Sequence, residues 1–235
     1  MQTDLSDSGK FERLLNRLAT DIVDVAIFNR LHTDLSASAD EFWQEFAQSP
    51  AFWSLTFQAH VEVVLFRLIR IYDTHDSALS LSSWLQTIKR NLHLFGAEHG
   101  AQNPDVMRRG AEPPDLDQLN QDINAVTPAD PLVKKLTSLR GNVIAHTSAR
   151  NIGEALHLED RFALTYEEIN TLVSRATTIL NRYSILFKRQ SWSTLIIGHD
   201  DFRNVLKALR ADLERYDAER AAEIERVTRV APLGA

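Results

Sequence analysis

Apolar residues recur at helical spacing along almost the whole chain, and this period constrains the fold more than any other feature. The stripe is clearest near the N-terminus, where it comprises Phe11, Leu14, Leu15, Leu18, Ile22, Val25 and Phe28. Only eight of the 235 residues are glycine, and alternating runs of Val, Ile and Thr are few, which argues against a β-rich fold. We therefore predict an all-α protein.

Helix start signals divide this pattern into elements. We expect longer helices over about 9–31, 50–73, 81–95 and 165–189, a final helix after Gly198 and the following His-Asp-Asp, and shorter ones over 38–47, 115–126 and from 131. Pro50 and Pro131 suit first turns, and Ser38 with Glu41 and Thr165 with Glu168 resemble capping boxes. The glycine- and proline-rich stretch 96–114 predicts a mobile surface loop. The whole forms one up-and-down helical bundle over residues 1–235, with additional helices and flexible tails at about 1–8 and 228–235.

Composition excludes several classes of protein. The chain has no cysteine, which removes disulfides, thiolate catalysis and cysteine-ligated zinc. No uninterrupted apolar run reaches the roughly 18 residues of a membrane span, and the N-terminus is polar rather than signal-like. We expect a soluble, cytoplasmic protein with no membrane partner.

Charge is unevenly distributed along the sequence. The net charge is −6, yet residues 131–153 and 171–199 contain no Asp or Glu. The first segment holds Lys134, Lys135, Arg140 and Arg150, and the second holds Arg175, Arg182, Lys188 and Arg189. Such segregation favours a local basic surface that meets phosphate.

The helix predicted from residue 131 carries an arginine and a histidine. At 100° per residue, Leu132, Leu136, Leu139 and Val143 form a buried stripe, and His146 lies on the same face. Arg140 and Asn142 lie on opposite shoulders of that stripe. A half-buried imidazole can take and give protons near neutral pH. Because Arg140 and His146 are about 120° and ~9 Å apart on an ideal helix, a joint site needs side-chain reach, helix distortion or a second copy of the helix.

The same residues allow a simpler interpretation. A histidine on an apolar stripe is most often a packed core or interface residue, and a shoulder arginine often pairs with a carboxylate. The spacing by itself leaves both possibilities open.

The run from Leu136 to Thr147 (LTSLRGNVIAHT) resembles the signature of HEPN domains, in which an arginine precedes a histidine by a few residues on a late bundle helix. The IAHT ending is similar to the abortive-infection U-type branch. The aromatic-rich helix ending at Tyr72 and Asp73, the LSLS run at 79–82 and the GHDDF run at 198–202 resemble that branch as well.

This resemblance implies a metal-independent endoribonuclease of a prokaryotic defence or toxin–antitoxin system. His146 would move the proton of an RNA 2′-hydroxyl, and Arg140 would hold the phosphate under attack. Asn142 would orient His146 or contact the phosphate, and the supporting residues would be Lys134, Lys135, Thr147 and Arg150. RNA is the implied partner, together with a second copy facing the motif helix and a possible antitoxin protein; no cofactor is implied.

Two departures from the family pattern are present. Gly141 stands where many active members carry a polar residue, and Ser148 stands where one branch has a tyrosine that its antitoxin modifies. The alternative function is a non-catalytic HEPN-like module that binds RNA, nucleotide or a protein partner. A structural helical protein is a third possibility.

Other polar clusters point to structure rather than to metal ligation. Asp73 with His75, and His199 with Asp201, sit at predicted helix boundaries, where Asp and His cap or end helices. Arg67 and Arg70 are expected to pair with carboxylates such as Glu62 or Asp73. Trp84 and Trp192 are expected in the core, and no phosphate-binding glycine loop or dinucleotide fingerprint occurs. We therefore predict no metal site.

Overall fold

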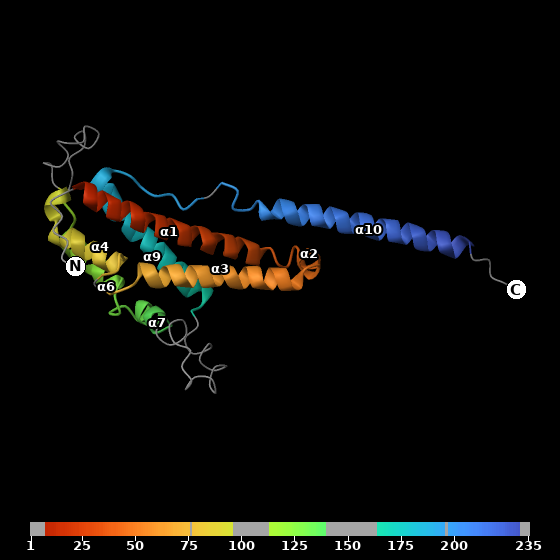
Figure 1. The fold of residues 1–235 in the computed structure, drawn as a ribbon, viewed down its shortest axis with the longest axis horizontal. Coiled ribbons are helices and arrows are strands. Elements are labelled where there is room, and N and C mark those ends of the chain that lie inside the picture. The colour runs from red at the N-terminus through yellow and green to blue at the C-terminus, as the bar shows by residue number, and fades with distance from the viewer. Residues whose placement is uncertain (1–7, 76, 96–112, 140–163, 196, 231–235) are drawn as a thin grey trace, which may run out of the picture. The chain divides into compact units, whose positions relative to one another are not determined.

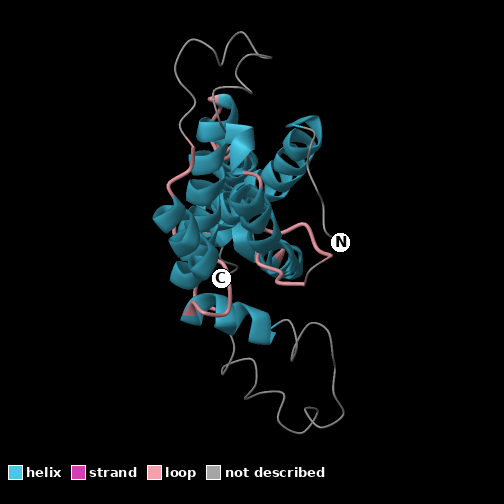
Figure 2. Cartoon of the chain, turned by 90° about the vertical axis from the view of Figure 1, so that its left-hand side faces the viewer, coloured by secondary structure: helices cyan, strands magenta, loops and turns pink. Residues whose placement is uncertain are grey.

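The computed structural model describes residues 8–75, 77–95, 113–139, 164–195 and 197–230, and all regular structure within them is helical (Figure 2). The elements, labelled in Figure 1, are α1 (Ser8–Ala37), α2 (Trp43–Ala47), α3 (Pro50–Ile71), α4 (Leu81–Arg90), the 3-10 helix η1 (Leu92–Phe95), α6 (Leu116–Ala125), α7 (Pro131–Leu139), α9 (Tyr166–Lys188) and α10 (Phe202–Val230). The all-α prediction is confirmed. The tail at about 1–8 and the loop at 96–114 lie almost wholly outside the described residues, so their mobility stays a prediction.

Contacts divide the chain into two compact units. Unit 1 comprises Met1–Asn29 and Val61–Leu195, and unit 2 comprises Arg30–His60 and Ile196–Ala235. Unit 1 therefore holds the first part of α1, the second part of α3, and the helices α4, α6, α7 and α9. Unit 2 holds the end of α1, α2, the start of α3 and α10. That residues 1–235 act as a single domain stays a prediction.

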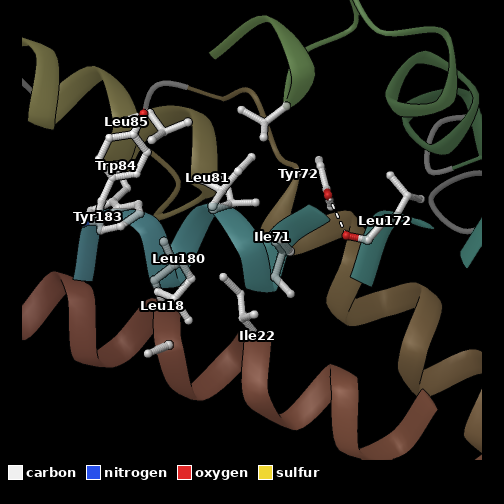
Figure 3. Close-up of a cluster of buried hydrophobic side chains, with 14 of the residues drawn as sticks. Leu18, Ile22, Ile71, Tyr72, Leu81, Trp84, Leu85, Leu172, Leu180 and Tyr183 are labelled. Carbon is white, nitrogen blue, oxygen red and sulfur yellow. Dashed lines mark hydrogen bonds between the residues drawn. The ribbon is translucent and has the colours of Figure 1, made fainter. Parts of the chain in front are cut away.

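The core of unit 1 is built on the predicted stripe of α1. Phe11, Leu15, Leu18, Ile22 and Val25 are each no more than 1% exposed. Figure 3 shows Leu18 and Ile22 of this stripe on the side of α1 that faces α9, and Leu81, Trp84 and Leu85 of α4 belong to the same core cluster. Burying a large apolar side chain contributes about 1.5–3 kcal/mol, so this stripe accounts for much of the stability of unit 1.

Two buried tyrosines in unit 1 donate hydrogen bonds to polar groups on neighbouring helices. The hydroxyl of Tyr72 donates to the carbonyl oxygen of Leu172 at 2.7 Å, as drawn in Figure 3. The hydroxyl of Tyr183 donates to the Asp122 carboxylate at 2.7 Å. Burial raises the pKa of both phenols, which therefore remain donors throughout the physiological range. Trp84 is only 1% exposed, which confirms the prediction that it lies in the core.

Helix α3 differs from the central core helix that its composition suggests. Its buried residues, Val64, Leu68, Ile69 and Ile71, all lie in its second half. In the first half, Phe52 is 60% and Leu55 66% exposed. Among the described residues α3 is also the one helix long and apolar enough to span a membrane by length and composition, a weak criterion that core helices meet too.

Local signals placed most helix starts correctly. The Thr165–Glu168 capping box is present at α9, and α3 begins at Pro50. The box at Ser38 is absent, because the Ser38 hydroxyl donates to the carbonyl of Leu35 at 2.7 Å and closes α1 instead. The predicted helix 81–95 is two elements, since α4 ends at Arg90 and a 3-10 helix follows Asn91.

Candidate functional site

The helix that leads into the arginine–histidine motif begins as the sequence predicts. Asp130 Oδ1 accepts from the backbone N–H groups of Leu132 and Val133 at 2.9 and 3.1 Å, and Pro131 occupies the first helical position. Arg175 on α9 reaches the same carboxylate at 3.1 Å. Burial alone would raise the pKa of Asp130, but these hydrogen bonds outweigh it and lower that pKa. The start of α7 is thus tied to α9 by charge as well as by packing.

The buried face of α7 agrees with the predicted stripe only in part, because Val133, which the stripe did not include, is fully buried while Leu132 is not. Leu136 is fully buried and Leu139 is 6% exposed. Leu132 is half-buried against the same core. His146 was predicted on this face, but the motif residues Arg140, Asn142, His146, Thr147 and Arg150 lie outside the described residues.

The two lysines of α7 have different surroundings. Nζ of Lys135 donates to both carboxylate oxygens of Glu168, at 2.8 and 2.7 Å. Lys134 is exposed and forms no ion pair with any residue that the structure describes. The hydrogen bond from Lys135 is the main reason that the pKa of Glu168 is lowered. Within the described part of the chain, Lys135 is therefore committed to Glu168 and Lys134 has no acidic partner.

Lys135 and Glu168 also bracket the motif segment in the chain. Lys135 lies one helical turn before Leu139, the last described residue of α7. Glu168 lies in the first turn of α9, and its other contact is the backbone N–H of Thr165, at 2.8 Å. Leu139 and Leu164, the described residues on either side of the motif segment, therefore each lie four positions in the chain from one partner of this ion pair.

The basic run on α9 is largely neutralised by acids from other helices. Arg182 forms an ion pair and hydrogen bond with Asp122 on α6, a carboxylate that is 6% exposed. Arg175 pairs with Asp130 and also donates to the carbonyl of Ala125 at 2.7 Å. The acid-free segment 171–199 is thus not a free basic surface over α9. The acids that neutralise it lie in a part of the sequence about 50 residues earlier, which the local charge count could not take into account.

A shallow pocket of about 510 Å³ lies along α9 where it meets α6. Hydroxyl, amide and charged side chains line it: Asp122, Glu167, Asn170, Thr171, Ser174, Arg175, Thr178 and Arg182, with Ala125 and Ile179. Sequence reasoning did not single out Asp122, because one acid on an amphipathic helix carries no local sign of burial. The charges of the pocket are balanced, so it does not select for an anion.

The remaining polar clusters have structural partners. Asp73 Oδ1 accepts from the backbone N–H of His75 at 3.0 Å, which forms a turn after α3. In unit 2, Nδ1 of His199 lies 2.8 Å from Asp34. The described residues contain no group of three or more His, Asp or Glu side chains arranged to hold a metal ion.

Arg67 and Arg70 do pair with carboxylates, but with those of α1. Arg67 lies 2.9 Å from Asp24 and 3.7 Å from Asp21, and Arg70 lies 3.0 Å from Asp21. These contacts join α1 to the second half of α3 in unit 1. Both arginines therefore serve to hold helices together.

The all-helical fold and the arginine–histidine motif together indicate a protein of the HEPN class. A family model described as AbiU2 matches residues 9–216, so the chain belongs to the AbiU2 (abortive-infection U-type) family of the HEPN superfamily. This family is one of defence-related HEPN domains. Neither the curated proteins nor the solved structures contain a significant match to the chain.

Proposed function

We propose that this chain is a metal-independent endoribonuclease of a prokaryotic defence or toxin–antitoxin system, with Arg140 and His146 as its working pair. The observation that carries the proposal is the family match over residues 9–216, which spans an intact arginine–histidine motif. The proposed location is the cytoplasm, and the proposed partners are RNA, a second copy of the chain and an antitoxin protein.

In the proposed reaction, His146 takes the proton of a ribose 2′-hydroxyl, and the 2′-oxygen attacks the adjacent phosphorus. The bond from phosphorus to the 5′-oxygen breaks, and that oxygen leaves with a proton from a histidine acting as acid. The products are a 2′,3′-cyclic phosphate and a free 5′-hydroxyl. A planar guanidinium at Arg140 stabilises the charge that develops on the phosphate oxygens. DNA lacks the 2′-hydroxyl and is not a substrate.

The described residues support this proposal through the helix that precedes the motif. Asp130 caps α7, Leu136 and Leu139 bury its apolar face, and Lys135 pairs with Glu168. A catalytic group needs such support, because a side chain is positioned only as well as the element that carries it. Lys134, exposed and without an ion pair in the described part of the chain, can meet an RNA phosphate.

Pairing of two chains would bring an arginine and a histidine from two motif helices together. It is one of three ways, with side-chain reach and helix distortion, to overcome the separation of about 120° that Arg140 and His146 have on one ideal helix. The proposed homodimer through the motif helix rests on that geometry and on the family, so it is tested together with the activity.

The test is cleavage of a labelled single-stranded RNA by wild type and by His146→Ala, with EDTA present. His93→Ala is the matched control, because His93 is an exposed histidine on η1. We expect wild type and His93→Ala to leave a cyclic phosphate end, and His146→Ala to be inactive with unchanged thermal stability.

Equal cleavage by wild type and His146→Ala would contradict the proposal. No cleavage by either across a panel of tRNA and mRNA substrates would favour the second candidate, a non-catalytic module that binds RNA, nucleotide or a protein. The observation that favours this second candidate is Gly141, which directly follows the arginine where many active members have a polar residue.

A further inference from the structure

Helix α10 carries an apolar stripe that is covered over only half of its length. At 100° per residue, the apolar side chains fall within an arc of about 100°. They are Phe202, Val205, Leu206, Leu209, Leu213, Tyr216, Ile224 and Val227. In the first half Leu206 is fully buried and Phe202, Leu209 and Leu213 are half-buried, although Val205 is 64% exposed; in the second half Tyr216, Ile224 and Val227 are 62%, 57% and 58% exposed.

The N-terminal half of α10 is held by contacts within unit 2. The helix packs against α2, and Nε of Arg210 donates to the buried carboxylate of Glu45 at 2.6 Å. The guanidinium of Arg210 also lies 4.5 Å from the centre of the Phe42 ring. Beyond Leu213 these contacts end while the stripe continues.

The C-terminal half of α10 needs an explanation, because a helical segment that makes no packing contacts within its own unit is marginal in water. Ion pairs within the helix support it, for example Arg226 with Glu223 at 2.7 Å and Arg229 with Glu225. Such exposed pairs each contribute only about 0.3–0.5 kcal/mol. An apolar stripe on a helix of this length marks a surface that another helix covers.

We propose that the C-terminal half of α10 pairs antiparallel with the same segment of a second copy of this chain. The positions on the seam repeat as a heptad, with Leu213, Arg220 and Val227 at one core position and Tyr216 and Glu223 at the other. The charges of Arg220 and Glu223 favour a second copy of the same helix as the partner, and they favour antiparallel over parallel pairing. In a parallel pair Arg220 would face another Arg220, and Glu223 would face another Glu223.

In the antiparallel pair, each side chain on the seam faces a complementary side chain of the second copy. Arg220 and Glu223 lie at equal distances on either side of the point between Ala221 and Ala222, and so do Tyr216 and Val227. A two-fold axis at that point sets Arg220 against the partner's Glu223 and Tyr216 against the partner's Val227. A two-fold interface requires such self-complementarity, and a central charged layer fixes the register. Arg220 has no ion-pair partner in the described part of the chain, whereas Glu223 pairs with Arg226 within the helix, so the partner's Arg220 would share or replace that exposed pair.

This pairing is independent of the proposed ribonuclease activity and of any pairing through the motif helix. It uses only residues of α10, which belongs to unit 2, whereas the motif follows α7 in unit 1. The two ideas can therefore succeed or fail separately.

The first experiment measures the molar mass of the full chain by light scattering after gel filtration. The seam variant is Tyr216→Glu with Val227→Glu. The matched control is Ala218→Glu with Ala222→Glu, which adds the same charge to exposed positions on the opposite side of α10. We expect the mass to halve in the seam variant and to stay at the wild-type value in the control, with equal helix content by circular dichroism. Because a pairing through the motif helix would by itself keep the mass unchanged, equal masses for the two variants overturn the proposal when Tyr216→Cys and Val227→Cys chains also fail to cross-link in the disulfide experiment below.

Charge exchange tests the register. Arg220→Glu should halve the mass, because it sets four carboxylates together at the centre, and adding Glu223→Arg should restore the wild-type mass. Failure of the double variant to restore it would overturn the proposed central layer.

Disulfide trapping tests the direction, since the chain has no cysteine of its own. A mixture of Tyr216→Cys and Val227→Cys chains should cross-link under mild oxidation, while neither variant cross-links with itself. A disulfide spans about 4.4–6.8 Å between Cα atoms, whereas in the antiparallel pair the two copies of residue 216 are about 16 Å apart along the axis. Cross-linking of Tyr216→Cys with itself, and not with Val227→Cys, would establish parallel pairing and overturn the proposal.

Discussion

Lys135 and Glu168 form a two-pronged ion pair in which one ammonium group donates to both oxygens of one carboxylate, at 2.8 and 2.7 Å. Lys135 lies in the middle of α7, and Glu168 completes the capping box of α9 by accepting from the backbone of Thr165. The pair therefore joins the chain just before the arginine–histidine motif to the chain just after that segment.

Lys135→Met is expected to lower the free energy of unfolding by less than about 1 kcal/mol, because the pair is partly exposed to solvent. Lys134→Met is the matched control and should change stability less, since Lys134 is exposed and makes no ion pair among the described residues. Urea denaturation followed by circular dichroism measures both. A larger loss for Lys134→Met would show that the ion pair does not stabilise the junction of α7 with α9.

The same change should alter the dependence of stability on pH. The pKa of Glu168 is lowered in the folded chain, so its contribution is complete above its ordinary value of about 4.5 and is lost as the pH falls through the lower, folded value. Wild type and Lys135→Met should therefore differ most at pH 7 and converge as the pH falls below about 4. Urea midpoints measured from pH 7 to pH 3 test this, and a difference that grows toward low pH would contradict it.

The two lysines should also differ in RNA binding if the proposed function is correct. Lys134→Ala, made in the inactive His146→Ala chain, should weaken RNA binding and reduce the slope of log affinity against log salt by about 1. Lys135→Ala should change the slope less, because the ammonium of Lys135 is committed to Glu168. Filter binding at several salt concentrations measures both slopes. Equal reductions would show that the ion pair opens to admit RNA.

Asp122→Ala should destabilise unit 1 strongly. Asp122 is 6% exposed, pairs with Arg182 and accepts the hydroxyl of Tyr183 at 2.7 Å, so its removal leaves both groups without their partner. Breaking a mostly buried pair of this kind costs roughly 2–4 kcal/mol after allowance for the partly exposed arginine. Asp117→Ala is the control on an exposed position of the same helix. Urea denaturation should show a change of a few tenths of a kcal/mol for the control, about the value expected for a surface acid.

Arg210→Met should destabilise unit 2 in a manner that depends on pH. The hydrogen bond from Arg210 lowers the pKa of the buried Glu45, so in wild type this carboxylate stabilises the fold above its unfolded pKa. Without Arg210 the buried carboxyl group prefers its protonated form, and its folded pKa should rise instead. The stability gap between variant and wild type should thus be widest at pH 7 and shrink as the pH falls toward 4.

Arg203→Met is the control for that experiment. Arg203 pairs with Glu41 at 2.6 Å, but the Glu41 side chain is 48% exposed and stays hydrated when the arginine is lost. The difference in stability between Arg203→Met and wild type should be small and nearly independent of pH. Thermal unfolding measured from pH 7 to pH 4 distinguishes the two variants. If the stability of both variants changed with pH in the same way, Glu45 would not be the group that causes the pH dependence.

The sequence by itself determined the class of fold, most helix starts and the family. The α1 stripe, the Asp130–Pro131 start of α7 and the Thr165–Glu168 box are as predicted, because each depends on residues no more than four positions apart. The arginine–histidine motif is likewise a local pattern. Where a local signal failed, as at Ser38, a neighbouring carbonyl offered the side chain another partner.

Only the tertiary structure decided which charges are free. Arg175 and Arg182 look like part of a basic surface in the sequence, and Asp130 and Asp122 neutralise them in the fold. The same is true of Lys135, which Glu168 holds 33 positions away, while the adjacent Lys134 stays exposed. The physical reason is that electrostatic pairing acts over a few ångströms in space. Packing, which brings distant segments of the chain to that distance, is a property of the whole fold.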